Sequence, residues 1–247
     1  MVKEGFRLPS LKLLKGEMKM AINLSKGNGI QLTKEVQGNK QTLTTIKLGC
    51  GWKASRGYYT KVEEVTKTVR KGFLGLGGTE VVTEQVERSI PIGNIDIDAS
   101  VFAYEGNRLV GKCYFAHKNL VNQMCRTVAR SSGDNRYGTN GKCDDETITI
   151  NVNEIDGFAD TLYLVLSIYD AEFRKQHFGM VQSAHVRVYD DKGMEMAYFN
   201  LTEDYENKTG IVVGKLVKVN GVFEFVALGD GVCVRDIAEF TKVAKKY

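Results

Sequence analysis

Eight short segments rich in Val, Ile, Thr, Tyr and Phe recur along the chain, with glycine and other turn-forming residues between them. Such residues favour extended strands, and many short strands separated by turns are typical of β-sandwiches and barrels. Only Pro9 and Pro91 are prolines, whereas 26 glycines are available for turns. The segments are TLTTIKLGCGW, NIDIDASVFAY, ETITINV, TLYLVLSIYD, AHVRVYD, EMAYFNL, GIVVGKLVKVN and GVFEFVAL. The sequence therefore predicts an all-β fold.

The apolar pattern places individual strands. In ETITINV, Ile148, Ile150 and Val152 alternate with polar residues, which predicts one buried and one wet face. In TLYLVLSIYD both faces are apolar, so this segment is predicted to be a central strand covered on both sides. Asn220 and Gly221 separate two further strands, and both residue types tolerate the positive φ of a tight hairpin turn.

Helical signals are scarce. A turn or two is expected over residues 171–177, and a terminal helix is predicted from about Val234 to Lys246. The terminal segment carries an apolar stripe, which is predicted to dock on the core rather than on a partner; the stripe consists of Ile237, Phe240, Val243 and Ala244.

Two segments look like additions to the predicted sandwich domain of residues 21–247. Residues 1–20 form an arm with five basic and two acidic residues. Residues 58–93 read as a long β-hairpin whose glycine-rich tip carries Phe73 and Leu74. Apolar residues at such a tip usually contact something, so we expect a protein partner at the arm and the hairpin.

Composition narrows the classes of function. The chain has 34 basic and 30 acidic residues, a balance too even for a dedicated nucleic-acid surface. Its five cysteines contain no CxxC pair, which favours free thiols in a reducing cytoplasm over a disulfide framework or zinc site. The sequence shows no apolar run long enough for a signal core or a membrane span. We expect a soluble, cytoplasmic protein.

Carboxylates gather in two places that could form one site. Asn94, Asp96 and Asp98 occupy alternate positions of a predicted strand and therefore share one face. The loop SSGDNRYGTNGKCDDE adds further carboxylates and glycines directly before the next strand. Several carboxylates held close together repel one another unless a cation lies among them. Calcium prefers oxygen ligands in a flexible, loop-built site, and magnesium ranks second; a solvated acidic loop is the alternative.

The motifs that carry the chemistry resemble those of the TerD family of bacterial tellurite-resistance and stress-response proteins. The resemblance covers roughly residues 21–240, apart from the hairpin. It is carried by Ile22–Glu35, IKLGCGW ending at Trp52, Ile95–Ser100, Ser132–Glu146, Leu166–Val188, and the NLTED and GKLVKVNGVFEF stretches.

This resemblance implies a calcium-binding β-sandwich of two antiparallel sheets. Carried over by position, the calcium ligands would be Asp96, Asp98, Asp134, Asn135, Asp144, Asp145 and Glu146. Asn94 stands where the family usually has Asp, and Lys142 stands where a small or acidic residue is usual. Asp170 and Glu172 match acidic positions of the family after the central strand and are second-tier candidates for calcium ligands.

Two classes of function remain to be compared. The sequence carries no nucleophile elbow, Walker loop or HExxH motif, so we expect no catalysis and no catalytic residues. The first hypothesis is a calcium-binding protein of tellurite resistance or stress response. The alternative is a structural or assembly module of a larger complex, filament or phage particle, which would use the arm and the hairpin for protein contacts. Binding of nucleic acid by the arm is not favoured, because its basic residues are spread out and Phe6 is the only aromatic residue among them.

Overall fold

The computed structural model describes residues 21–54, 58–71, 78–139, 141, 143–201 and 205–247. The predicted arm of residues 1–20, the tip residues Phe73 and Leu74, and Lys142 lie outside the described residues.

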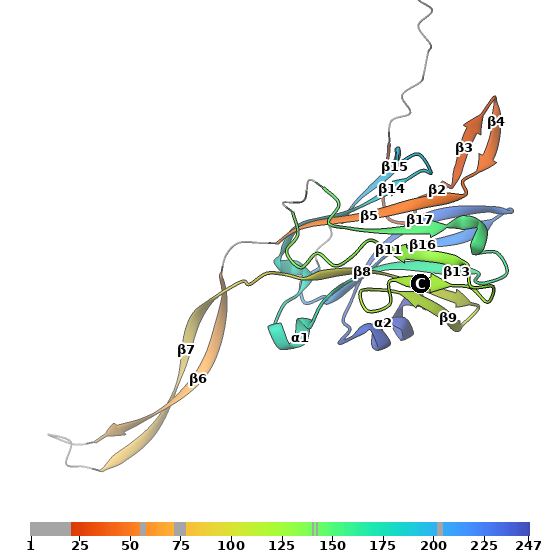
Figure 1. Cartoon of the computed structure of the whole chain (residues 1–247). Helices are drawn as coiled ribbons and strands as arrows, with labels where there is room; N and C mark the ends of the chain where they lie inside the picture. Colours follow the sequence, from red (N-terminus) through yellow and green to blue (C-terminus); the bar gives the residue numbers. More distant parts are fainter. Residues whose placement is uncertain (1–20, 55–57, 72–77, 140, 142, 202–204) are drawn as a thin grey trace, which may run out of the picture.

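Two sheets form the body of the protein (Figure 1). The first has seven strands in the order β1-β15-β14-β5-β12-β11-β10, and the second has six in the order β2-β17-β16-β13-β8-β9. The strands of the first sheet are β1 (Ile22–Leu24), β5 (Thr45–Ala54), β10 (Asn119–Val121), β11 (Thr127–Ser131), β12 (Glu146–Asn151), β14 (Val181–Tyr189) and β15 (Glu195–Leu201). Those of the second are β2 (Gly29–Gln31), β8 (Ile97–Glu105), β9 (Arg108–Cys113), β13 (Thr161–Ile168), β16 (Gly210–Val219) and β17 (Val222–Val232).

The all-β sandwich prediction is confirmed, with one difference in pairing. Neighbouring strands are antiparallel throughout both sheets except for β1, which runs parallel to β15. A small hairpin of β3 (Thr33–Val36) and β4 (Asn39–Thr42) forms a separate two-stranded sheet that the sequence analysis did not predict. Two short 3-10 turns, Val152–Glu154 and Phe178–Met180, complete the connections.

One core lies between the sheets and a smaller one lies outside them. Alternate residues such as Leu48 and Trp52 of β5 and Ile148 of β12 point into the main core. The central strand β13 is buried on both faces, as predicted, because its Tyr163 and Val165 pack on the opposite side.

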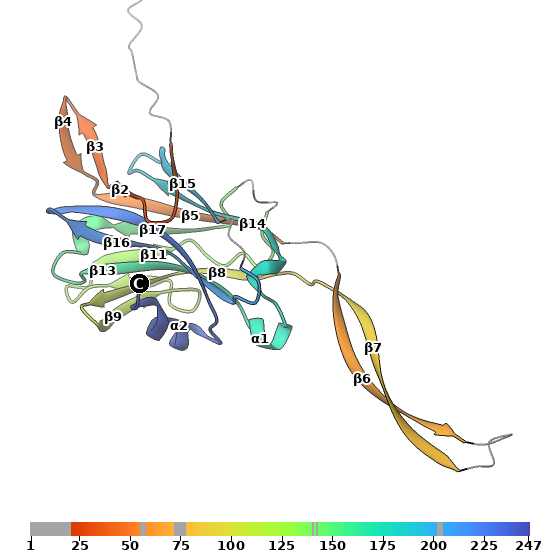
Figure 2. The same ribbon diagram turned by 180° about the vertical axis from the view of Figure 1, so that it is seen from behind.

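The C-terminal helix α2 (Ile237–Ala244) covers that opposite side (Figure 2). Phe240 is completely buried there, so core docking of the apolar stripe is confirmed. The helix begins later than predicted because Asp236 caps it, accepting the Glu239 N–H at 2.7 Å. The other helix, α1 (Ala171–Arg174), ends early because Lys175 adopts a left-handed conformation.

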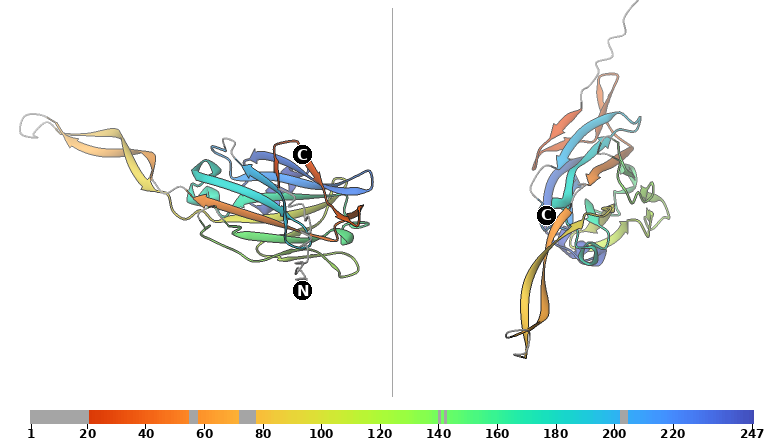
Figure 3. Two further views of the ribbon diagram at one scale, coloured as in Figure 1. Left: turned by 90° about the horizontal axis from the view of Figure 1, so that it is seen from above. Right: turned by 90° about the vertical axis from the view of Figure 1, so that its left-hand side faces the viewer.

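The predicted long hairpin is present as β6 (Tyr58–Arg70) and β7 (Thr79–Pro91). These strands pair with each other in a two-stranded sheet of their own and project as a twisted ribbon from one end of the sandwich (Figure 3).

Two sequence predictions concern the cysteines and membrane-spanning helices. All five cysteines are described, and all are free. No helix among the described residues is long and apolar enough to cross a membrane.

Candidate metal centre

Asp96 and Asp98 form the predicted row of oxygens at the start of β8. Ile95 and Ile97, which alternate with them, are completely buried in the main core. Because side chains alternate along an extended chain, both aspartates turn to the other side. They are nevertheless shielded from solvent, with exposed fractions of 6% for Asp96 and 4% for Asp98. Asn94, at the far end of the row, is exposed.

Asp134 completes a cluster of three carboxylates. It lies in the loop between β11 and β12, where Arg136 Nε donates to Asp134 Oδ2 over 3.2 Å. One oxygen from each of Asp96, Asp98 and Asp134 lies within 4.8 Å of the other two. Within the part of the chain that the structure describes, no other three acidic, histidine or cysteine side chains come this close together. The strand and the loop therefore meet as the sequence analysis expected.

Glu146 joins the cluster from the first position of β12. Its side chain is buried, and its Oε2 accepts the Ala99 N–H of β8 at 2.8 Å. Its Oε1 accepts the Asn135 N–H of the loop at 3.1 Å. Glu146 thus ties one strand of each sheet to the loop that carries Asp134.

Burial and mutual repulsion make these carboxylates unusually weak acids. Burial, followed by the charges of Glu146, Asp96 and Asp134, raises the pKa of Asp98 to about 8. Burial also raises the pKa of Glu146 to about 7, although the two backbone N–H donors oppose the rise. The pKa of Asp96 is raised by burial and by Asp134. A bound cation would favour the charged forms of all these groups.

An unsatisfied oxygen gives a direct test of whether the cluster suits a cation. Asp96 Oδ1 is buried and has no hydrogen-bond partner. On the other oxygen, Arg174 Nη1 lies 4.0 Å from Asp96 Oδ2, beyond hydrogen-bonding range. Buried polar atoms are normally paired, so an unpartnered carboxylate oxygen beside two further carboxylates fits a hard cation.

Trp52 connects the segment that carries Asp96 to the loop before β12. Its indole Nε1–H donates to the Ile95 carbonyl at 3.2 Å, next to Asp96. Its backbone N–H donates to Asp145 Oδ2 at 2.8 Å. The loop approaches the ring so closely that a Cβ on Gly138 would lie 2.6 Å from Nε1. Trp52 is buried in the main core, and its hydrogen bonds place the loop as well.

Asn135 and Asp145 bond to one another within the loop. Asn135 Nδ2 donates to Asp145 Oδ1 over 3.2 Å, and the Thr139 hydroxyl donates to the same oxygen. Asn135 Oδ1 accepts the Tyr137 N–H at 3.1 Å. Both predicted ligands therefore have partners that shape the loop around Asp134.

Asp144 lies away from the cluster, on the outer face of the seven-stranded sheet. Arg187 Nη1 donates to its Oδ1 at 3.1 Å and the Tyr189 hydroxyl donates to its Oδ2 at 2.6 Å. His185 Nε2 lies 3.7 Å from Oδ1. Burial alone would raise the pKa of Asp144, but His185, Tyr189 and Arg187 outweigh it and lower that pKa. This carboxylate already has Arg187 and Tyr189 as partners, so it anchors the loop.

The remaining candidates and the missed residues lie at the edge of the centre. Asp170 and Glu172 are exposed at the start of α1 and do not belong to the carboxylate cluster. The sequence analysis missed Arg136 and Arg174, which contact Asp134 and approach Asp96. Arg136 follows the GDN turn directly and could have been noticed there, whereas no sequence pattern marks Arg174.

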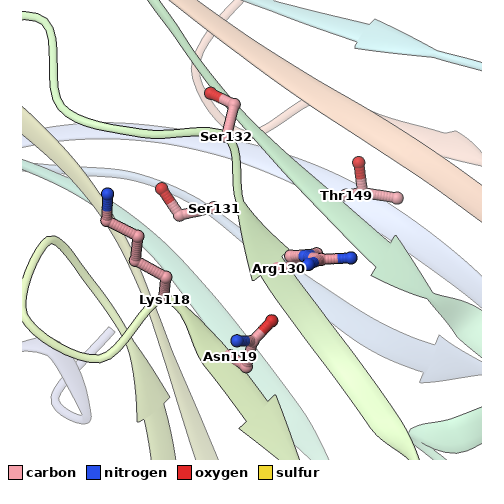
Figure 4. Close-up of a pocket in the computed structure, with 6 residues that line it drawn as sticks. All are labelled: Lys118, Asn119, Arg130, Ser131, Ser132 and Thr149. Carbon is pink, nitrogen blue, oxygen red and sulfur yellow. The ribbon is translucent and has the colours of Figure 1, made fainter.

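A pocket of about 390 Å³ near the edge of the seven-stranded sheet has the opposite chemistry (Figure 4). Its lining supplies two cations and several amide or hydroxyl groups but no carboxylate: Lys118, Asn119, Arg130, Ser131, Ser132 and Thr149. Such a lining does not suit a metal cation, so the carboxylate cluster is the candidate centre.

Known proteins resemble this chain in sequence over most of its length. Residues 20–243 match the model of the TerD domain. The stress response protein SCP2 of Bacillus subtilis (strain 168) is 32% identical over 216 residues, which cover 86% of this chain and 93% of the relative. The tellurium resistance protein TerD of an Alcaligenes species is 31% identical over 214 residues, covering 86% and 91%.

Solved structures share the fold. The protein of unknown function SAV2460 aligns with a TM-score of 0.55 at 15% identity, covering 82% of this chain and 97% of that protein. A homologue of the telluride resistance protein TerD, SCO6318 from Streptomyces coelicolor A3(2), aligns with a TM-score of 0.53 at 14% identity, covering 81% and 95%. From the family match and the relatives above 30% identity, we conclude that this chain belongs to the TerD domain family of tellurium-resistance and stress-response proteins.

Proposed function

We propose that the protein binds calcium and serves a stress response or tellurium resistance without catalysing a reaction. The observation that carries the proposal is the cluster of the buried Asp96 and Asp98 with the exposed Asp134, in which Asp96 Oδ1 has no hydrogen-bond partner. The role in stress response or tellurium resistance is proposed from the names of the relatives.

Four side chains are proposed to hold the ion: Asp96, Asp98, Asp134 and Glu146. Asn135 and Asp145 would organise the loop, and Asp144 would anchor it to the outer face of the sheet. All of the proposed ligand atoms are carboxylate oxygens, the hard donors that calcium and magnesium prefer. Calcium is favoured because it accepts about six to eight oxygens in irregular geometry, which a loop can supply with backbone carbonyls and water. The ion would supply positive charge that relieves the repulsion among the carboxylates.

Calorimetric titration of chelator-treated protein with calcium tests the proposal. We expect binding by the native chain and none by Asp98→Asn, because that change removes a central charge while keeping the size of the side chain. Asp156→Asn is the matched control, since Asp156 is exposed and pairs with Lys218 at 2.7 Å, away from the cluster. Absence of calcium binding by the native chain would overturn the proposal.

The sole tryptophan provides a second readout. Trp52 is buried and bonded both to Ile95, next to the candidate ligand Asp96, and to Asp145 of the loop. Ordering of the loop by calcium should therefore change its fluorescence in the native chain and in Asp156→Asn. The same titration of Asp98→Asn should leave the fluorescence unchanged.

A further inference from the structure

The β6–β7 hairpin presents two free strand edges. It forms an isolated two-stranded sheet, so the described residues of each strand have a ladder partner on one side alone. Isolated two-stranded ribbons are at best marginally stable in water, and unpaired edges are templates for another strand. The hairpin also stands clear of both sheets of the sandwich, so a second chain could approach it (Figures 1 and 3).

The surface of the hairpin favours contact with an uncharged or self-complementary partner. Val62, Val69 and Val81 are 55%, 48% and 65% exposed, so the ribbon offers apolar area to a partner. The basic and acidic residues of the described hairpin are equal in number: Lys61, Lys67, Arg70, Lys71 and Arg88 against Glu63, Glu64, Glu80, Glu84 and Glu87. Two copies of this hairpin therefore carry no net charge that would hold them apart.

The sequence of β6 is complementary to itself in an antiparallel register centred near the middle of the strand. If Val65 faces Val65 of a second copy, Glu63 faces Lys67 of that copy, and Lys67 faces its Glu63. This register brings no like charges opposite each other. Moving the centre by one or two residues brings like charges opposite each other. With Glu63, Glu64 or Lys67 at the centre, that residue would face the same residue of the second copy. With Thr66 at the centre, Lys61 would face Lys71 of the second copy. Charges on an edge strand normally oppose pairing, and here they would favour the register centred on Val65 over these four neighbouring registers.

The other edge is less suited to the same contact. Pro91 lies in β7 and has no N–H to donate. β7 also carries Glu80, Glu84 and Glu87 against Arg88 alone, so two β7 edges would repel each other.

We propose that two copies of this chain associate through the free edges of β6, antiparallel and centred on Val65, to form a four-stranded sheet from their two hairpins. The contact is symmetric, so it closes as a dimer and leaves the β7 edges outermost. It does not depend on calcium, because the hairpin lies outside the carboxylate centre.

Charge reversal across the contact tests the proposal. In a dimer of E63K, the lysine introduced in each copy faces Lys67 of the other copy. In a dimer of K67E, the glutamate introduced in each copy faces Glu63 of the other copy. We expect each single variant to weaken dimerisation roughly tenfold in sedimentation velocity, because two attractive cross-strand pairs become repulsive. Retention of native calcium binding and of the thermal transition in each variant would show that the sandwich is intact.

Mixing the two variants separates edge pairing from damage to the hairpin itself. An E63K chain opposite a K67E chain has opposite charges at both positions, so an equimolar mixture should form heterodimers with nearly native affinity. Native mass spectrometry with one variant ¹⁵N-labelled distinguishes heterodimers from homodimers. Simple loss of hairpin stability would not be repaired by mixing.

The matched control uses the outer strand. E80K should leave dimerisation unchanged, because β7 stays outside the contact and Glu80 pairs with Lys71 rather than with Glu63 or Lys67. A monomeric native chain at about 100 μM, a concentration on the scale of weak protein association, would overturn the proposal. So would a failure of mixing to restore the dimer, or an equal loss of the dimer in E80K.

Discussion

At the residue scale, the behaviour of the centre follows from where each carboxylate points. Asp98 and Glu146 are both buried and close to other acids, so their protonated forms are favoured. Asp144, two residues before Glu146, faces Arg187 and Tyr189 and has a lowered pKa. Acids that are neighbours in the sequence thus divide into candidate ligands and a loop anchor.

The raised pKa values predict how calcium stabilisation depends on pH. Unfolded carboxyl groups titrate near pH 4, whereas Asp98 and Glu146 titrate near 8 and 7 in the folded protein. A raised acid pKa stabilises the fold below the unfolded pKa, and that contribution is lost as pH rises through the folded pKa. In chelator the melting temperature should therefore fall as the pH is raised toward 8.

Calcium should reverse this trend, because it competes with protons for the same oxygens. The increase in melting temperature that calcium produces should grow between about pH 5 and 8, and Asp98→Asn should abolish it. Calorimetry across this range, with matched ionic strength, measures both quantities. A calcium effect that is larger at pH 5 than at pH 8 would contradict the assignment of Asp98 and Glu146 as ligands.

At the element scale, the loop before β12 can rest on β5 only because β5 lacks side chains there. A Cβ on Gly49 would lie 2.2 Å from Asp144 Oδ2, and a Cβ on Gly51 would lie 2.2 Å from the Cys143 carbonyl. These glycines alternate with the buried residues Leu48 and Cys50, so they lie on the outer face of the sheet. The two glycines on either side of Cys50 therefore leave room on the outer face of β5 for the loop that carries Cys143 and Asp144.

Gly49→Ala should displace the loop and weaken calcium binding. We expect a loss of about 1–3 kcal/mol in unfolding free energy from overpacking, together with a lower calcium affinity. Denaturant unfolding and calorimetric titration measure the two effects. Gly93→Ala is the control, because its added Cβ would have only Gln176 nearby, at 3.9 Å. Native calcium affinity in Gly49→Ala would show that the contact of Asp144 with the sheet does not position the ligands.

At the scale of the whole molecule, the sandwich and the hairpin are structurally separate. The hairpin strands pair only with each other among the described elements, whereas the carboxylates come from the start of β8, from β12 and from the loop between β11 and β12. The separation allows metal binding and self-association to be tested independently.

Replacing residues 58–91 with a short Gly-Ser linker should leave calcium binding intact and remove the dimer. The melting transition of the sandwich should change little, because neither of its cores includes β6 or β7. Calorimetric titration and sedimentation velocity report the two outcomes. Loss of calcium binding on deletion would show that the hairpin supports the centre after all.

Much of the fold could be predicted from local patterns in the sequence. Alternation of apolar and polar residues identified the faces of β12 and β13, and Asn220 with Gly221 forms the β16–β17 turn with φ angles of 49° and 83°. The order of strands in each sheet, the parallel pairing of β1 with β15 and the small β3–β4 hairpin did not follow. Those features depend on which distant segments bury area against one another, which local periodicity does not encode.

For the candidate centre, the sequence by itself determined that Asp96 and Asp98 share a face and that acidic residues crowd the loop before β12. Only the tertiary structure decided which of those acids converge. Glu146 turns inward as part of β12, whereas Asp144 reaches Arg187 and Tyr189 on a strand more than forty positions away. The direction of a loop side chain depends on the partners that the packed sheets bring to it, so it was settled when β14 came to lie beside β5.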